Sequence, residues 1–113
     1  MFSHMMVGSN DIARSKKFYD SLFGAVGGKP GLQDEKGRLM YMHNGGIFMV
    51  TKPIDGQPAT HANGATIGFA MENPAQADAW HKAGLEGSAM KLYLAYLRDP
   101  DGNKLCALHR IPG

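Results

Sequence analysis

The chain of 113 residues has one cysteine, one tryptophan and no long apolar run. One cysteine cannot form an internal disulfide, which excludes the disulfide framework of a small secreted domain. No apolar stretch approaches the roughly 20 residues that a membrane-spanning helix needs. The chain also opens without a basic segment followed by an apolar one, as a secretory leader would have. We therefore expect a soluble, cytoplasmic protein with no membrane partner.

Neither sign of charge is in large excess, because 12 basic and 10 acidic residues leave a formal net charge of +2. No basic cluster or ladder of aromatic residues is present, so nucleic acid is not an expected partner. The length predicts a single domain spanning residues 1–113. A domain of this size buries only a modest core, and we therefore expect a homodimer.

The first half of the chain, residues 1–52, reads as strand, helix and strands. A short apolar run ends at Gly8, and Asn10 or Asp11 can cap a helix that stops at Gly24. The runs "GRLMYMH" and "GIFMVTK" flank Asn44-Gly45, which is a strong hairpin signal because such turns need positive φ. The eight methionines are interpreted mainly as core filler, with two or three of them in a binding surface.

The second half repeats this order after a polar linker at residues 53–64. "ATIGFAM" predicts a strand, Asn73-Pro74 starts a helix whose His81 we place on the surface, and Asp99–Gly102 joins two closing strands. Aligning the halves puts His4 on Thr66 and Met49 on Cys106. The second half is shorter between its helix and its last hairpin, so its sixth strand is expected to be short or absent. The prediction is an α+β fold of paired βαβββ modules, about residues 1–52 and 65–113.

Two stretches carry a resemblance to a known family. They are "MFSHMMVGSNDIARSKKFYDSLFG" near the start and "YLAYLRDPDGNKLCALHR" near the end. With the element order, they resemble the vicinal oxygen chelate superfamily, which includes glyoxalases, bleomycin resistance proteins and extradiol dioxygenases. The resemblance implies that two modules curl their sheets into a half-open cup, and that two subunits share such cups in a dimer.

The resemblance also implies where a metal would bind. Metal-dependent members place ligands at the positions of His4, Met49, Thr66 and Cys106, and would have residues such as His, Glu, His and Glu there. Only His4 keeps a ligand type in this sequence. The alternation of side chains along each strand separates two faces, and the resemblance implies that the faces carrying these four residues line the cup.

Each candidate has alternative interpretations. His4 is either a metal ligand, or a polar contact to a ligand in the cup, or a half-buried imidazole. Cys106 is interpreted first as a small apolar residue, with a zinc ligand beside His4 or a nucleophile paired with a histidine as alternatives. His61 is interpreted as a solvated loop residue or a cup residue. Tyr96 can offer its hydroxyl to a ligand.

The functional hypothesis is therefore a protein that binds a small, partly apolar molecule in its cup, with no cofactor and without the full metal site. The alternative is a lyase, isomerase or dioxygenase that uses Zn, Ni, Mn or Fe to act on vicinal oxygens of a small substrate. A third possibility is a structural dimer whose cup is vestigial. The sequence identifies no catalytic residue and names no substrate.

Overall fold

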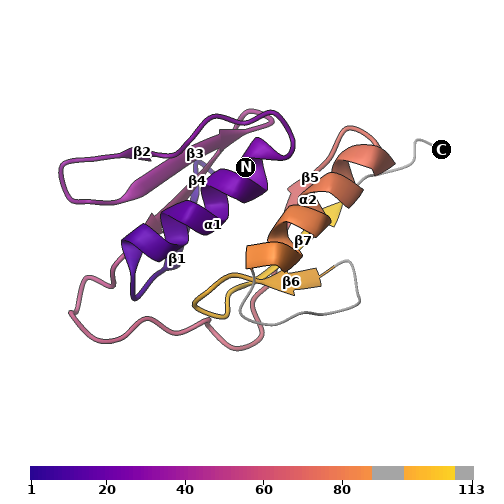
Figure 1. Ribbon diagram of the computed structural model, residues 1–113. Coiled ribbons are helices and arrows are strands. Elements are labelled where there is room, and N and C mark those ends of the chain that lie inside the picture. The colour runs from indigo at the N-terminus through magenta and orange to yellow at the C-terminus, as the bar shows by residue number, and fades with distance from the viewer. Residues whose placement is uncertain (88–95, 109–113) are drawn as a thin grey trace.

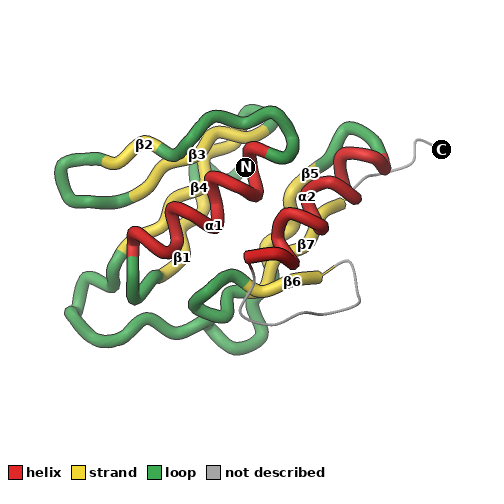
Figure 2. Tube along the Cα trace, viewed as in Figure 1, coloured by secondary structure: helices red, strands yellow, loops and turns green. Residues whose placement is uncertain are grey.

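The computed structural model describes residues 1–87 and 96–108, which form two α/β units side by side (Figure 1). In chain order the elements are β1 (Met5–Gly8), α1 (Ile12–Gly24), β2 (Leu32–Gln33), β3 (Leu39–His43), β4 (Gly46–Thr51), β5 (Ile67–Ala70), α2 (Pro74–Gly87), β6 (Tyr96–Arg98) and β7 (Lys104–Leu108). Figure 2 shows that a long loop, residues 52–66, joins the units. The predicted α+β architecture of two curved sheets with helices on one face is confirmed.

The first unit begins with β1 and α1, and its helix starts where the sequence predicts. Asp11 caps α1, because its side chain accepts a hydrogen bond from the backbone N–H of Arg14 at 3.1 Å. In the first sheet the strand order is β1-β4-β3-β2, with β1 parallel to β4 and the other pairs antiparallel. Asn44 and Gly45, at φ 46° and 80°, make the tight turn between β3 and β4. The Asn-Gly hairpin signal is thus confirmed.

The second unit repeats this plan with fewer described strands. Asn73 caps α2 by accepting from the backbone N–H of Gln76 at 2.7 Å, and Pro74 is the first helical residue. The second sheet has the order β5-β7-β6, with β5 parallel to β7. The helix continues to Gly87. The strand that the sequence predicted to be short or absent, between α2 and the closing hairpin, falls on residues 88–95, outside the described residues. It is not the strand labelled β6.

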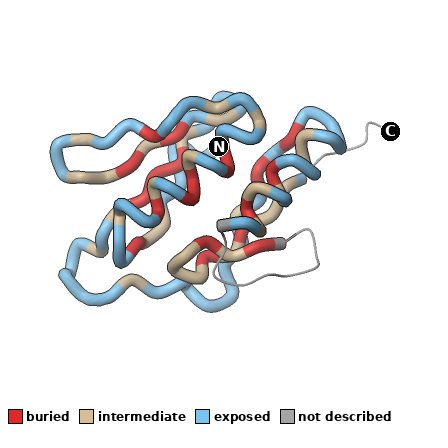
Figure 3. Tube along the Cα trace, viewed as in Figure 1, coloured by how far each residue is buried: buried red, intermediate tan, exposed pale blue. Residues whose placement is uncertain are grey.

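The hydrophobic core lies between the two helices and the sheet faces behind them. Trp80, Tyr19, Leu22, Leu97 and Leu105 are all fully buried there. The two helices also contact each other, which joins the units through their helical layer. Figure 3 shows buried positions along the helices and the strands behind them, whereas the 53–64 linker is mostly exposed. The opposite faces of both sheets carry no helix in the described part of the chain.

Two sequence expectations about individual residues are wrong. The methionines are not mainly core filler: Met5, Met6 and Met42 are 39%, 38% and 71% exposed. Met6 and Met42 lie on the sheet face that no helix covers in the described chain, and Met5 lies at the sheet edge. His81 is not simply a surface residue of α2, since it is half-buried and its Nε2 has no hydrogen-bond partner among the described residues. Neither α1 nor α2, the helices in the described residues, is long and apolar enough to cross a membrane.

Candidate functional site

The candidate site is built on the uncovered faces of the two sheets, which we call the open faces. Strand pairing settles which residues share them, because directly opposed residues point the same way. In the first sheet Met49 is opposite both Met6 and Met40, while Phe48 is opposite Tyr41 in the core. In the second sheet Cys106 is opposite Gly68.

A row of apolar side chains crosses the open face of the first sheet from edge to edge. It consists of one residue from each strand: Met6 in β1, Met49 in β4, Met40 in β3 and Leu32 in β2. Leu32 is 71% exposed and Met6 38%, whereas Met49 is only 7% exposed. Because thioether side chains are flexible and polarisable, such a row makes an adaptable apolar surface.

His4 lies directly before β1 rather than inside it. The side chain is exposed, and its Nδ1 is 2.7 Å from the Ser3 hydroxyl oxygen. The sequence prediction of a strand containing His4 is therefore wrong by one residue, since pairing with β4 starts at Met5. An exposed imidazole at a strand end has room to approach a ligand or a second chain.

Cys106 lies in β7 on the open face of the second sheet, where Gly68 makes room for its sulfur. A Cβ added at Gly68 would come 3.3 Å from Cys106 Sγ, so the thiol lies directly beside the glycine. Partial burial raises the pKa of Cys106, and the charge of Lys104 only partly opposes this shift. The thiol is therefore protonated at neutral pH, which does not favour a nucleophile or a ready metal ligand.

The remaining candidates are divided between the second sheet and a loop. Thr66 directly precedes β5 and is exposed. Tyr96 is opposite Cys106 in the strand register, but its side chain lies outside what the structure describes. His61 is exposed in the linker and lies against the β6–β7 turn, 3.3 Å from where a Cβ of Gly102 would be.

The four positions implied to hold a metal are thus distributed over both sheets. Met49 lies in the first sheet and His4 directly before its first strand, whereas Cys106 lies in the second sheet and Thr66 directly before its first strand. Of their donors, the His4 imidazole and a deprotonated Cys106 thiol are of kinds that bind zinc, whereas the Met49 thioether and the Thr66 hydroxyl are not ligands that tight zinc or iron sites use. Across residues 1–87 and 96–108, no group of three or more His, Cys, Asp or Glu side chains could hold a metal ion.

A cavity of about 200 Å³, which sequence reasoning did not predict, lies where the two units meet. Apolar side chains from both sheets line most of it, including Met5, Ile47 and Phe69. At one end, His43 Nε2 and Asn44 Nδ2 both donate to the carbonyl oxygen of Ala70 at 2.7 Å. The β3–β4 turn is thereby tied to the end of β5. The cavity offers apolar walls to a small group.

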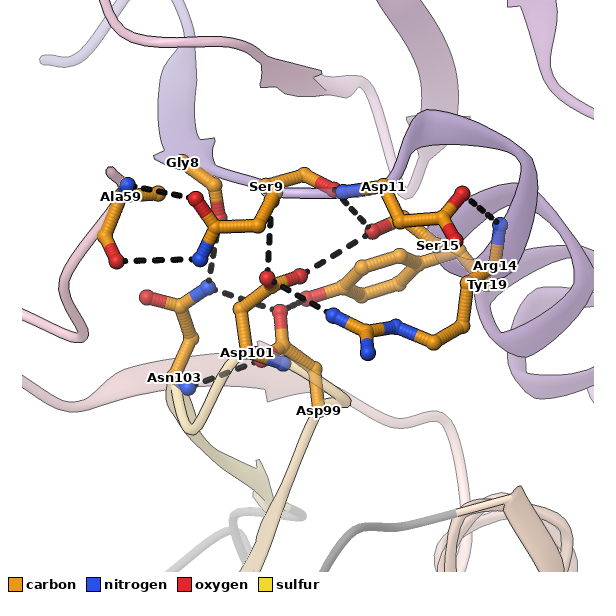
Figure 4. Close-up of polar contacts among 11 residues, drawn as sticks. Gly8, Ser9, Asp11, Arg14, Ser15, Tyr19, Ala59, Asp99, Asp101 and Asn103 are labelled. Atoms are coloured by element: carbon orange, nitrogen blue, oxygen red, sulfur yellow. Dashed lines mark hydrogen bonds and ion pairs between the residues drawn. The ribbon is translucent and has the colours of Figure 1, made fainter. Parts of the chain in front are cut away.

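A buried polar junction also links the units, at the turn between β6 and β7 (Figure 4). Asp99 is fully buried, and the Tyr19 hydroxyl donates to its Oδ2 at 2.6 Å. The backbone N–H of Asn103 donates to Asp99 Oδ1, and its side-chain nitrogen to Oδ2, both at 2.8 Å. Burial raises the pKa of Asp99, while the hydrogen bonds from Tyr19 and Asn103 oppose the shift. Because the Asp99 carboxylate already accepts hydrogen bonds from Tyr19 and Asn103, it is suited to holding the two units together rather than to transferring a proton.

Asp101 extends this junction to the start of α1. It accepts hydrogen bonds from the backbone N–H of Asn10 at 2.8 Å, from the Arg14 guanidinium at 3.0 Å and from the Ser15 hydroxyl at 3.3 Å. Sequence reasoning treated the Asp-Pro-Asp-Gly-Asn stretch as a turn and as part of the family resemblance, and missed these roles. The signal available was two carboxylates within one tight turn.

No protein-family model matches the chain, and no curated protein matches it. Among solved structures, a glyoxalase/bleomycin resistance protein from Albidiferax ferrireducens is 50% identical, with a TM-score of 0.88 over 98% of this chain and 99% of that one. A glyoxalase-related enzyme from Fulvimarina pelagi is 16% identical (TM-score 0.74; 97% and 88% covered), and a lactoylglutathione lyase from Agrobacterium tumefaciens 17% identical (0.67; 96% and 92%). The last two support the fold alone.

Proposed function

The chain belongs to the glyoxalase/bleomycin resistance protein family, and from that premise we propose that it binds a small, partly apolar molecule over its open faces. The observation that carries the proposal is the row of Met6, Met49 and Met40, uncovered by any helix in the described chain. Ligand sites are mostly apolar surfaces with a few polar groups. Here His4 and Thr66 supply polar groups beside apolar strands.

The proposed site holds no zinc, nickel, manganese or iron ion. One imidazole and one protonated thiol leave a zinc, nickel, manganese or iron ion without the three good ligands that such sites use. We expect elemental analysis of protein purified without an affinity tag to give no stoichiometric Zn, Ni, Mn or Fe. Close to one tightly held ion per subunit would instead support the alternative of a metal-dependent lyase, isomerase or dioxygenase.

The proposal also includes a homodimer. β1 and β5 are each at an edge of their sheet, so each has one side without a strand partner in the described chain. Large apolar side chains such as Met42 and Leu108, 71% and 49% exposed, lie on the open faces. Exposed edges and apolar patches of this kind are what a second copy can cover. A lone cysteine fits a reducing compartment, so we place the dimer in the cytoplasm.

Ligand binding is tested by titrating ¹⁵N-labelled protein with a library of small apolar compounds that carry carbonyl or hydroxyl groups. We expect at least one compound to shift the amide signals of residues in β1, β4 or β7. Met42→Lys places a charge on the open face and should weaken this binding at least tenfold. Ala79→Lys is the matched control, because Ala79 is exposed on α2, away from the open faces. Shifts confined to other residues, or equal losses in both variants, would contradict the proposed site.

A further inference from the structure

The methionine row has a geometry that its role as an apolar surface does not require. Met6, Met49 and Met40 lie directly opposite each other on the adjacent strands β1, β4 and β3. Neighbouring strands are about 4.8 Å apart, and a methionine side chain has three rotatable bonds beyond its Cα. The two outer sulfur atoms can therefore approach the central one without moving the backbone.

Burial supports such an approach. Met49 is 7% exposed, yet it is not a member of the hydrophobic core cluster between helices and sheets. Since its side chain points to the open face, its shielding comes from neighbours on that face. Met6 remains 38% exposed at the sheet edge, so the row has a sheltered centre and an accessible side.

The chemistry of three thioethers selects a particular kind of ion. Thioether sulfur is a soft, uncharged donor that suits Cu(I), whereas imidazole and carboxylate donors suit zinc, manganese and iron. We propose that Met6, Met40 and Met49 together bind one Cu(I) ion on the open face of the first sheet. The ion enters as Cu(I) and stays Cu(I), so three sulfur–metal bonds form and no electron is transferred. This goes beyond the proposed function, in which the row serves only as an apolar wall.

The first test uses Ag(I), a soft monovalent ion that undergoes no redox change here, as a probe. Cys106→Ser protein removes the thiol, which would otherwise bind a soft ion by itself. With the methionine methyl groups labelled with ¹³C, addition of one equivalent of Ag(I) should shift the signals of Met6, Met40 and Met49. The signals of Met5 and Met71 should stay in place, because Met5 is opposite the core residue Phe48 and Met71 is buried. Equal shifts of all methyl signals, or none, would overturn the proposal.

The second test measures affinity for Cu(I), supplied without oxygen, by competition with the chromophoric chelator bathocuproine disulfonate. Met49→Leu keeps the size and apolar character of the side chain and removes only the sulfur. We expect it to weaken Cu(I) binding at least tenfold in the Cys106→Ser background. Met5→Leu, in the same sheet but on the core face, should change it less than twofold. Binding that is equal in the two variants, or that is lost with Cys106→Ser alone, would show that the row is not the site.

Discussion

At the scale of the residue, Cys106 is a thiol sheltered on one side by Gly68 and half-exposed on the other. Partial burial raises its pKa above the ordinary value, and Lys104 moderates the shift. A thiol reacts as its thiolate, so the reactive fraction at pH 7 is smaller than for an ordinary cysteine. We expect alkylation by iodoacetamide to be slower than that of N-acetylcysteine at pH 7, and its rate to rise through a higher pH range.

The same alkylation experiment also tests the contribution of Lys104 to the pKa of Cys106, with Lys17 as the control position. Lys104→Gln removes the charge that favours the thiolate and should raise the pKa of Cys106 further, which slows alkylation at pH 8. Lys17→Gln, an exposed position on α1, should leave the rate unchanged. Alkylation as fast as that of an activated cysteine at pH 6 would contradict the interpretation of Cys106 as a cup-lining apolar residue.

Alternation along strands correctly predicted which residues point to the open faces, because side chains alternate in any strand. Met49 and Cys106 are examples. Alternation does not predict what covers a face. The methionines were therefore assigned to the core, although half of the sheet surface has no helix over it in the described chain. Burial depends on tertiary packing, which a local pattern does not contain.

At the scale of the element, the turn between β6 and β7 acts as a connector between units. Tyr19 on α1 and Asp99 in the turn are both buried and share a 2.6 Å hydrogen bond. Tyr19→Phe removes the donor and leaves a buried carboxylate oxygen with one partner fewer. We expect a loss of about 1–3 kcal/mol in the free energy of unfolding. Urea denaturation followed by fluorescence of Trp80 measures it.

Asp78→Asn serves as the control for the Tyr19→Phe experiment. Asp78 is exposed on α2, and its substitution should change stability by less than about 0.5 kcal/mol. If Tyr19→Phe were as neutral as Asp78→Asn, the buried bond would not stabilise the junction. The sequence showed the turn through its Asp-Pro-Asp-Gly composition, but its partner on α1 depends on how the units meet.

The turn between β3 and β4 is an element that the sequence predicted fully. Gly45 has a φ of 80°, in a region of backbone conformation that residues with a Cβ rarely adopt. Gly45→Ala should therefore cost about 1 kcal/mol of unfolding free energy, measured by thermal denaturation. Gly24→Ala is the matched control, because nothing lies within 4 Å of the added Cβ and its φ is negative. At a helix end we expect this change to be neutral or slightly stabilising.

At the scale of the whole molecule, the internal repeat predicted two similar units and their element order. It could not predict that α1 and α2 would contact each other while β1 and β5 remain at separate sheet edges. How two units dock depends on side chains such as Asp99, His43 and Asn44, which no periodic pattern marks. The candidate site is divided between sheets for the same reason, with His4 in one unit and Cys106 in the other.

This division makes the oligomeric state the decisive property of the whole molecule. A second copy could bring the open face of one first sheet next to the second sheet of its partner, covering both edges and the exposed apolar residues. We expect light scattering at micromolar concentration to give a mass of about twice the 12.2 kDa of one chain. A mass near that of a single chain would rule out a homodimer.

Charge substitutions on the open faces then locate the interface. Met42→Glu with Leu108→Glu places one carboxylate on each sheet, at positions 71% and 49% exposed, so the folded monomer should tolerate both. Burying them in a dimer would leave two charges without partners, which is strongly unfavourable. The double variant should therefore shift the mass to that of a monomer, whereas Ile54→Glu, on the exposed linker, should leave the dimer intact. A dimer that survives the double variant but dissociates with Ile54→Glu would contradict an interface on the open faces. It would show instead that the interface involves the 53–64 linker.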